Sequence, residues 1–238
     1  VRAVALTSSL PAEGKSLVNV LLAKTLSEMG QRVLLVDADL RKPQMHTRLG
    51  LNNLSGLSNL LAEDDQHWSD VVQPVPTYDN WSVITAGRRP PDPTRLLSSK
   101  RMHALVADLA QGADFDIVLF DTPPVLGLAD AALVAEHCDG LMLLVSLNCV
   151  DRGLPKESVA RINSSGAPLL GVVTNAMKPE QQENAYGYGY AAAATYAHYA
   201  DTDDSDAEEG TKTLAQPSNS LLRAIQARRR QFMRWIDS

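Results

Sequence analysis

Residues 1–41 of the chain read VRAVALTSSLPAEGKSLVNVLLAKTLSEMGQRVLLVDADLR, and the other segments are best understood relative to them. The apolar residues 1–6 predict a strand that leads into the loop 7–16. Apolar residues then recur at helical spacing until Gly30, which is typical of a helix stop. A second apolar strand, residues 33–36, ends in two aspartates. This order of strand, loop, helix and strand predicts a nucleotide-binding unit.

The loop carries the residue types that a triphosphate requires. Gly14, Lys15 and Ser16 supply backbone N–H groups, a cation that follows the phosphate, and a hydroxyl for Mg²⁺. The usual template has a glycine where this chain has Ser9, and an ordinary surface turn is the alternative. The residues predicted to contact nucleotide are Pro11, Ala12, Glu13, Gly14, Lys15, Ser16 and Leu17.

Carboxylates follow two further strand ends. Asp37 and Asp39 close the second strand, and Asp121 closes a third predicted strand, residues 116–120. Because the carboxyl ends of parallel strands meet at one edge of a sheet, we expect these acids beside the phosphate loop. We predict that Ser16 binds Mg²⁺ directly and that Asp37 and Asp121 hold its water ligands. A helix or turn cap is the alternative role for Asp121.

Strands and helices alternate through the rest of residues 1–178, which we predict to be one nucleotide-binding domain. Further strands are expected at 81–85, 141–145 and 169–173, and helices at 56–62, 93–109, 129–137 and 154–163. The last two strands are continuous apolar runs, which predicts that they are buried on both faces. The alternation predicts an α/β fold with a doubly wound, mostly parallel sheet and helices on both faces.

Composition limits the classes of function. A chain of 238 residues can hold one sizeable core, and its net charge of -6 argues against general nucleic-acid affinity. Cys138 and Cys149 lack metal-ligand spacing, which fits a reducing cytoplasm. No run of about 18 apolar residues is present. Because the chain begins at Val1, inside a predicted strand, we expect it to be a fragment of a longer protein.

The composition changes sharply after Met177. Residues 179–200 form a tyrosine-rich tail, and residues 201–219 form an acidic linker that we predict to be disordered. Residues 220–238 predict a basic amphipathic helix. Such a helix either serves as a surface-lying anchor or a partner helix, or docks on its own domain. Five of the six tyrosines lie in the tail: Tyr186, Tyr188, Tyr190, Tyr196 and Tyr199.

These features together resemble the cytoplasmic catalytic domain of the bacterial tyrosine kinases that regulate capsule and exopolysaccharide export, the BY-kinase family. The matching segments are residues 11–16, 34–41, 43–46 and 121–124 and the tyrosine cluster 186–199. The resemblance implies the P-loop NTPase fold of the partition and division-site ATPase type. It also implies a protein tyrosine kinase that uses ATP and Mg²⁺ and phosphorylates its own C-terminal tyrosines.

The resemblance assigns roles to individual residues. Lys15, Asp37, Asp39 and Asp121 are the expected catalytic residues, and a carboxylate must accept the tyrosine proton, with Asp37 slightly favoured over Asp39. Asn175 resembles the residue that meets adenine in this group of ATPases, although a turn or strand cap is the alternative.

The resemblance also implies partners and a location. The acceptor tail belongs to the same chain or to a neighbouring subunit of a homo-oligomer. A membrane-spanning chain-length regulator region is expected N-terminal to this chain, which places the domain on the cytoplasmic side of the inner membrane. No nucleic-acid partner is expected.

The chain departs from the family pattern at three positions. The family commonly has glycine at Ala12, and if this position needs positive φ, alanine costs about 1 kcal/mol and is expected to loosen the nucleotide grip. The family usually has Asn at Asp92 and Glu at Arg95, which bears on subunit contacts or regulation. The candidate roles of Arg41 are a contact with the acidic pair, a contact with a phosphate, and a plain surface ion pair.

Two other functions fit parts of the pattern. A partition or division-site ATPase switch carries an extra lysine early in its phosphate loop, and none occurs near Leu10. A non-catalytic, nucleotide-sensing regulator of polysaccharide chain length is permitted by Ala12 and by the missing glycine at Ser9.

Overall fold

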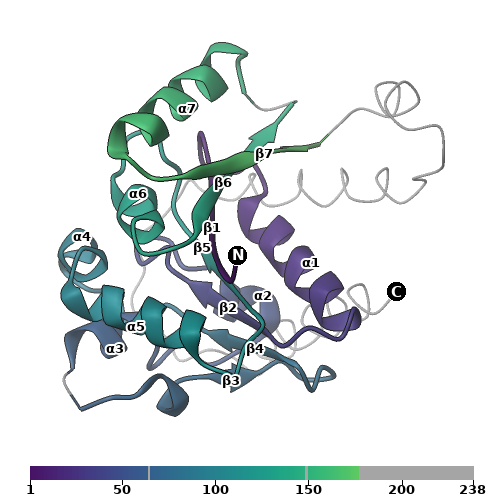
Figure 1. Ribbon diagram of the computed structural model, residues 1–238, viewed down its shortest axis with the longest axis vertical. Coiled ribbons are helices and arrows are strands. Elements are labelled where there is room, and N and C mark those ends of the chain that lie inside the picture. The colour runs from purple at the N-terminus through teal and green to yellow at the C-terminus, as the bar shows by residue number, and fades with distance from the viewer. Residues whose placement is uncertain (64, 148–149, 177–238) are drawn as a thin grey trace, which may run out of the picture.

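The computed structural model describes residues 1–63, 65–147 and 150–176. One seven-stranded sheet in the order β3-β4-β2-β5-β1-β6-β7 runs through this part of the chain (Figure 1). Neighbouring strands pair in parallel except β3 and β4, which are antiparallel. The predicted doubly wound, mostly parallel α/β fold is therefore confirmed. The predicted tail, acidic linker and amphipathic helix lie outside the described residues.

The elements have the following bounds. The strands are β1 (Ala3–Ser8), β2 (Val33–Asp37), β3 (Gln73–Pro74), β4 (Trp81–Ile84), β5 (Ile117–Asp121), β6 (Gly140–Ser146) and β7 (Leu169–Asn175). The helices are α1 (Lys15–Glu28), α2 (Met45–Leu49), α3 (Leu57–Ala62), α4 (Pro93–Leu97), α5 (Lys100–Gln111), α6 (Asp130–Ala135) and α7 (Gly153–Ser165), with a 3-10 turn η1 (Trp68–Asp70).

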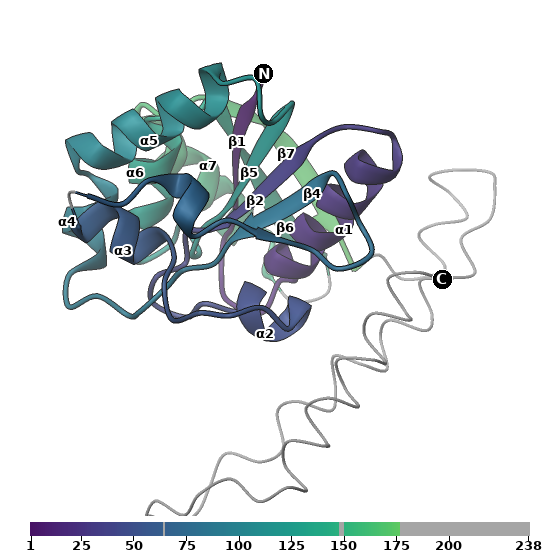
Figure 2. The same ribbon diagram turned by 90° about the horizontal axis from the view of Figure 1, so that it is seen from below.

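Helices cover both faces of the sheet. Helices α1 and α2 lie on one face and α3 to α7 on the other (Figure 2). Each face has its own apolar core, so every residue of β1 and β2 is buried. Burial on both faces explains why these strands are apolar up to the polar residues at their carboxyl ends, with no polar alternation before them.

The helix expected over 93–109 is in fact two helices. Helix α4 ends at Leu97, and α5 begins at Lys100 after the two serines at 98 and 99. The Ser99 hydroxyl accepts a hydrogen bond from the Met102 N–H at 3.2 Å, so this side chain caps the start of α5. The apolar spacing continues across the break, which is why periodicity alone suggested one helix.

The expected burial of β7 on both faces is wrong. Leu170 is 45% exposed, Val172 51% and Val173 37%. β7 is the last strand of the sheet order, so it has a neighbour on one side only. An apolar run indicates a strand but does not show whether the strand lies in the middle or at the edge of the sheet. The prediction of burial assumed a position in the middle.

The parallel strands bring their carboxyl ends to one edge of the sheet. In the pairing of β2 with β5, Asp37 lies opposite Asp121, and Leu6 of β1 also pairs with Asp121. The loop after β1 therefore meets both acidic strand ends, as the sequence predicted. None of the helices in the described ranges has the length and apolarity needed to cross a bilayer.

Candidate nucleotide-binding site

The phosphate loop turns from β1 into α1 through Gly14. Gly14 has a φ of 91° and directly precedes α1, a helix of 14 residues. A Cβ atom at this position would lie 2.6 Å from Asn175 Nδ2, so a side chain here would collide with Asn175. A glycine turn that leads into a helix N-terminus is the arrangement that binds phosphate, and the loop thus fits a polyphosphate.

The other predicted contact residues surround this turn. Pro11 and Ala12 are exposed, Glu13 is buried, and Leu17 is half-buried in the first turn of α1. Ser9, at the template's glycine position, is fully buried, and its hydroxyl lies 2.8 Å from the hydroxyl of Ser158 in α7. The loop therefore replaces the missing glycine by a side-chain contact with a helix.

Ala12 lies in the left-handed region, with a φ of 65°. Position 12 therefore has the positive φ at which alanine is less favourable than the glycine common in the family. A residue with a Cβ is strained there because the Cβ approaches the carbonyl oxygen.

Replacing Ala12 by glycine should therefore stabilise the protein. The strain that is removed exceeds the extra freedom of glycine in the unfolded chain, so we expect a gain of about 1 kcal/mol, or roughly 2–4 °C in Tm. Differential scanning calorimetry measures this shift. The matched control is Ala113→Gly, an exposed loop alanine without positive φ, which should lower Tm slightly. Equal shifts for both variants would contradict the strain at Ala12.

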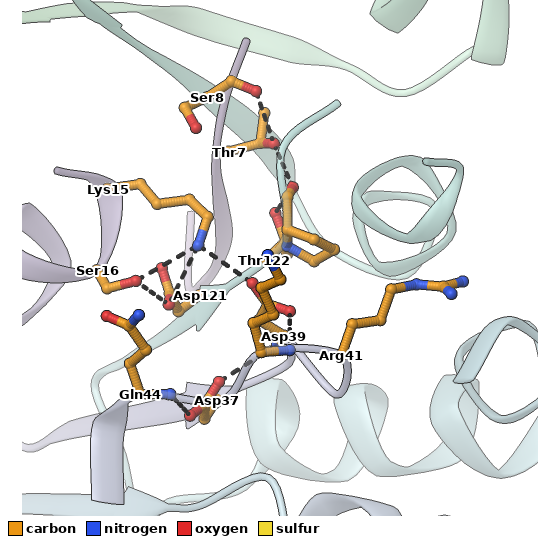
Figure 3. Close-up of polar contacts among 12 residues, drawn as sticks. Thr7, Ser8, Lys15, Ser16, Asp37, Asp39, Arg41, Gln44, Asp121 and Thr122 are labelled. Carbon is orange, nitrogen blue, oxygen red and sulfur yellow. Dashed lines mark hydrogen bonds and ion pairs between the residues drawn. The ribbon is translucent and has the colours of Figure 1, made fainter. Parts of the chain in front are cut away.

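Lys15 lies between two acidic groups (Figure 3). Its Nζ atom is 3.4 Å from Asp39 Oδ2 and 3.7 Å from Asp121 Oδ2, and it is 3.4 Å from the Ser16 hydroxyl. Because phosphate oxygens are also anionic, a bound polyphosphate can replace these acids as partners of the ammonium group.

Asp121 connects the end of β5 to α1. Its Oδ2 accepts the Ser16 hydroxyl at 2.7 Å, and its Oδ1 accepts Asn19 Nδ2 at 2.9 Å. Burial raises the pKa of Asp121, while Lys15 and the two hydrogen bonds oppose this rise. Asn19 was not predicted. The sequence feature that could have indicated its role is its position three residues after Ser16, which places both side chains on one helix face.

Asp37 is held by the segment that follows β2. Its Oδ2 accepts the N–H groups of Gln44 at 3.1 Å and Met45 at 3.0 Å, where α2 begins, and its Oδ1 accepts the Asp39 N–H at 3.3 Å. Burial, followed by repulsion from Asp121, raises the pKa of Asp37 to about 8. The two acids predicted to hold metal-bound water are thus brought together.

Arg41 points away from Lys15 (Figure 3). Its Nε is 2.6 Å from Asp130 Oδ2 and its Nη2 is 2.9 Å from Thr94 Oγ1. Of the three candidate roles for Arg41, the structure thus shows an ion pair, and its partner Asp130 is buried. The pair connects the loop after β2 to the first turns of α4 and α6.

Asp92 and Arg95, which differ from the usual family residues, lie at the start of α4. The Asp92 carboxylate accepts the Arg95 N–H at 3.1 Å and caps α4. Asp and Asn are equally good helix caps, so the difference at Asp92 does not weaken this helix start. Both side chains are exposed.

Asn175, at the end of β7, is brought against the phosphate loop. Its Nδ2 donates to the Glu13 carbonyl oxygen at 2.9 Å. Its contact with adenine stays a prediction. The five predicted acceptor tyrosines, 186 to 199, lie outside the described residues.

The family model described as an AAA domain matches residues 2–154. Tyrosine-protein kinase YwqD of Bacillus subtilis is 36% identical over 179 residues, which are 74% of this chain and 73% of that protein. Tyrosine-protein kinase wzc of Salmonella typhimurium is 38% identical over 72% of this chain, but the match spans only 23% of that protein. Part of the relatives' length thus has no counterpart here.

A solved structure is similar as well. The kinase domain of the Escherichia coli tyrosine kinase ETK has a TM-score of 0.71 and 31% sequence identity, with 79% of this chain and 72% of that chain covered. The similarity therefore extends over the fold of most of this chain.

Proposed function

Because the chain belongs to the bacterial tyrosine-kinase (BY-kinase) family, we propose that it transfers the γ-phosphoryl group of ATP to tyrosine hydroxyl groups, including those in residues 186–199. The single observation that carries the proposal is the placement of Lys15 between Asp39 and Asp121, beside the Ser16 hydroxyl at the phosphate loop. Phosphoryl transfer depends on positioning and on charge compensation, and these groups supply both.

The loop would hold the substrate ATP. Backbone N–H groups of residues 12–16 would bind the β-phosphate, and Lys15 would exchange its two acidic partners for β- and γ-phosphate oxygens. Asn175 closes the loop from the side of β7 and is the proposed adenine contact. The ammonium group of Lys15 then compensates the negative charge that moves onto the leaving oxygen.

The site fits an Mg²⁺ ion that protein and nucleotide coordinate together. No group of three or more His, Cys, Asp and Glu side chains suited to a metal ion occurs among residues 1–63, 65–147 and 150–176. Mg²⁺ usually keeps water and phosphate ligands, so the Ser16 hydroxyl is the proposed direct ligand, with Asp37 and Asp121 binding its waters. When bound, Mg²⁺ would neutralise phosphate charge.

The transfer step needs one carboxylate to accept the proton of the tyrosine hydroxyl. The tyrosine oxygen forms a bond to the γ-phosphorus, the bond from the γ-phosphorus to the bridging oxygen breaks, ADP leaves, and the tyrosine proton moves to Asp39 or Asp37. The hydrogen bonds favour Asp39, because it accepts one backbone N–H group, that of Lys42, whereas Asp37 accepts three and has less acceptor capacity left for the proton.

The wider role follows from the family. The chain would regulate exopolysaccharide synthesis and export from the cytoplasmic side of the inner membrane, next to a membrane-spanning chain-length regulator region. Phosphates added beside the six acids of 201–209 increase repulsion, so tail phosphorylation would act as a switch on assembly of a homo-oligomer.

Mass spectrometry of the purified chain after incubation with Mg-ATP tests the kinase. We expect phosphate on one or more tyrosines of residues 186–199 and none after incubation with Mg-ADP. ATP hydrolysis without phosphate on the tail would remove the kinase proposal and favour the ATPase switch. Nucleotide binding without either reaction would favour the non-catalytic regulator.

A further inference from the structure

Glu13 is a buried acid inside the phosphate loop. Its side chain belongs to a residue that is only 2% exposed, and no ion pair joins it to a Lys, Arg or His among the residues that the structure describes. A buried carboxylate is costly unless hydrogen bonds compensate for the lost water. Its burial next to a polyphosphate site therefore needs a structural explanation.

Two backbone N–H groups supply the compensation. Glu13 Oε1 accepts the Leu10 N–H at 2.6 Å, and Oε2 accepts the Ser146 N–H at 2.9 Å. Leu10 lies at the start of the same loop and Ser146 is the last residue of β6. One carboxylate thus closes the loop on itself and fastens it to a neighbouring strand, and hydrogen bonds to a charged acceptor are the stronger ones.

The backbone of Glu13 has a further contact. Its carbonyl oxygen accepts Asn175 Nδ2 at 2.9 Å, so the residue contacts the ends of both β6 and β7. Two residues of this loop stand where glycine would be expected. Ser9 occupies the glycine position of the usual phosphate-loop template, and Ala12 has a φ of 65°, which favours glycine. The loop's shape therefore depends on contacts from outside it.

We infer that Glu13 is a positioning residue that holds the phosphate loop in its anion-binding shape before nucleotide arrives. Its carboxylate oxygens are engaged by Leu10 and Ser146, so the charge is compensated by N–H groups that the phosphates do not need. A loop already in its bound shape loses less entropy on binding, so this contact contributes to affinity for ATP and ADP. The inference rests on the nucleotide-binding part of the proposed function and not on tyrosine transfer.

The variant Glu13→Gln tests the inference. Glutamine has the same shape, but its NH₂ group would face one of the two N–H donors, so one arm of the contact is lost. We expect the Kd for Mg-ADP, measured by calorimetry, to rise about tenfold, and this factor to exceed the fall in the rate at saturating Mg-ATP. Glu13→Asp keeps the charge but is shorter, so its Kd should lie between those of the wild type and Glu13→Gln.

Controls separate positioning from general stability. Glu28→Gln, an exposed acid at the far end of α1, should bind Mg-ADP as the wild type does. Amide hydrogen exchange without nucleotide should become faster at Leu10 and Ser146 in Glu13→Gln. Wild-type affinity in Glu13→Gln, or a lower Tm with unchanged affinity of the folded fraction, would overturn the inference. Absence of binding by the wild type would instead overturn the proposed function.

Discussion

Replacing Lys15 by methionine should abolish tail phosphorylation, with the rate falling by about a hundredfold or more. Methionine has nearly the same length and no charge. It therefore cannot compensate the charge on the transferring phosphate, and it leaves Asp39 and Asp121 facing the phosphates without their cation. Quantitative mass spectrometry of residues 186–199 after timed incubation with Mg-ATP gives the rate.

A lysine on the same helix provides the control. Lys24 is a partly buried residue of α1 that pairs at 3.6 Å with Glu28, away from the phosphate loop. Lys24→Met should phosphorylate its tail at the wild-type rate. If Lys15→Met keeps the wild-type rate, the loop is not catalytic and the transfer must take place elsewhere.

Replacing Asp121 by asparagine should slow phosphorylation and weaken the effect of Mg²⁺ on ADP affinity. The carboxylate accepts hydrogen bonds from both Ser16 and Asn19, and it is one of two acids proposed to hold metal-bound water. Asparagine has similar shape but offers one acceptor atom and no charge. We expect phosphorylation to fall about a hundredfold, and Mg²⁺ to increase ADP affinity less than it does in the wild type.

The acid at the other end of the same strand serves as comparison. Asp116 precedes β5 and forms an ion pair with Arg32 at the opposite edge of the sheet. Asp116→Asn should leave phosphorylation and the Mg²⁺ effect unchanged. Asp121→Asn with an undiminished Mg²⁺ effect would show that Asp121 has only a structural role.

The nucleotide-binding edge could be predicted because it depends on local rules. Strand, glycine turn and helix follow one another in sequence, and parallel strands present their carboxyl ends together. Lys15, Ser16, Asp39 and Asp121 therefore meet as expected. The order of strands and loops was enough to predict that these residues lie at one edge of the sheet, although not which of them contact one another.

Other features depend on packing between distant segments. The hydrogen bonds of Glu13 with Ser146, and of Arg41 with Thr94, join residues more than 50 positions apart. No spacing within one element signals such pairs. For the same reason an apolar run such as β7 indicated a strand but not its exposed place at the end of the sheet.

Short elements were missed for a different reason. Helix α2 has 5 residues, and its start is fixed by the two N–H groups that donate to Asp37 rather than by its own side-chain pattern. Strand β3 has 2 residues, one of them Pro74, which lacks a backbone donor. Elements this short depend on their neighbours, so their own sequence gives little signal.

Calorimetric titration of the purified chain with ADP and ATP at millimolar Mg²⁺ tests the central claim most directly. That claim is that β1, β2 and β5 place an ammonium group, a hydroxyl group and carboxylates around one magnesium-bound polyphosphate. The account predicts saturable heat with one site per chain for both nucleotides, and a weaker interaction when EDTA removes Mg²⁺. No detectable heat from either nucleotide would contradict it.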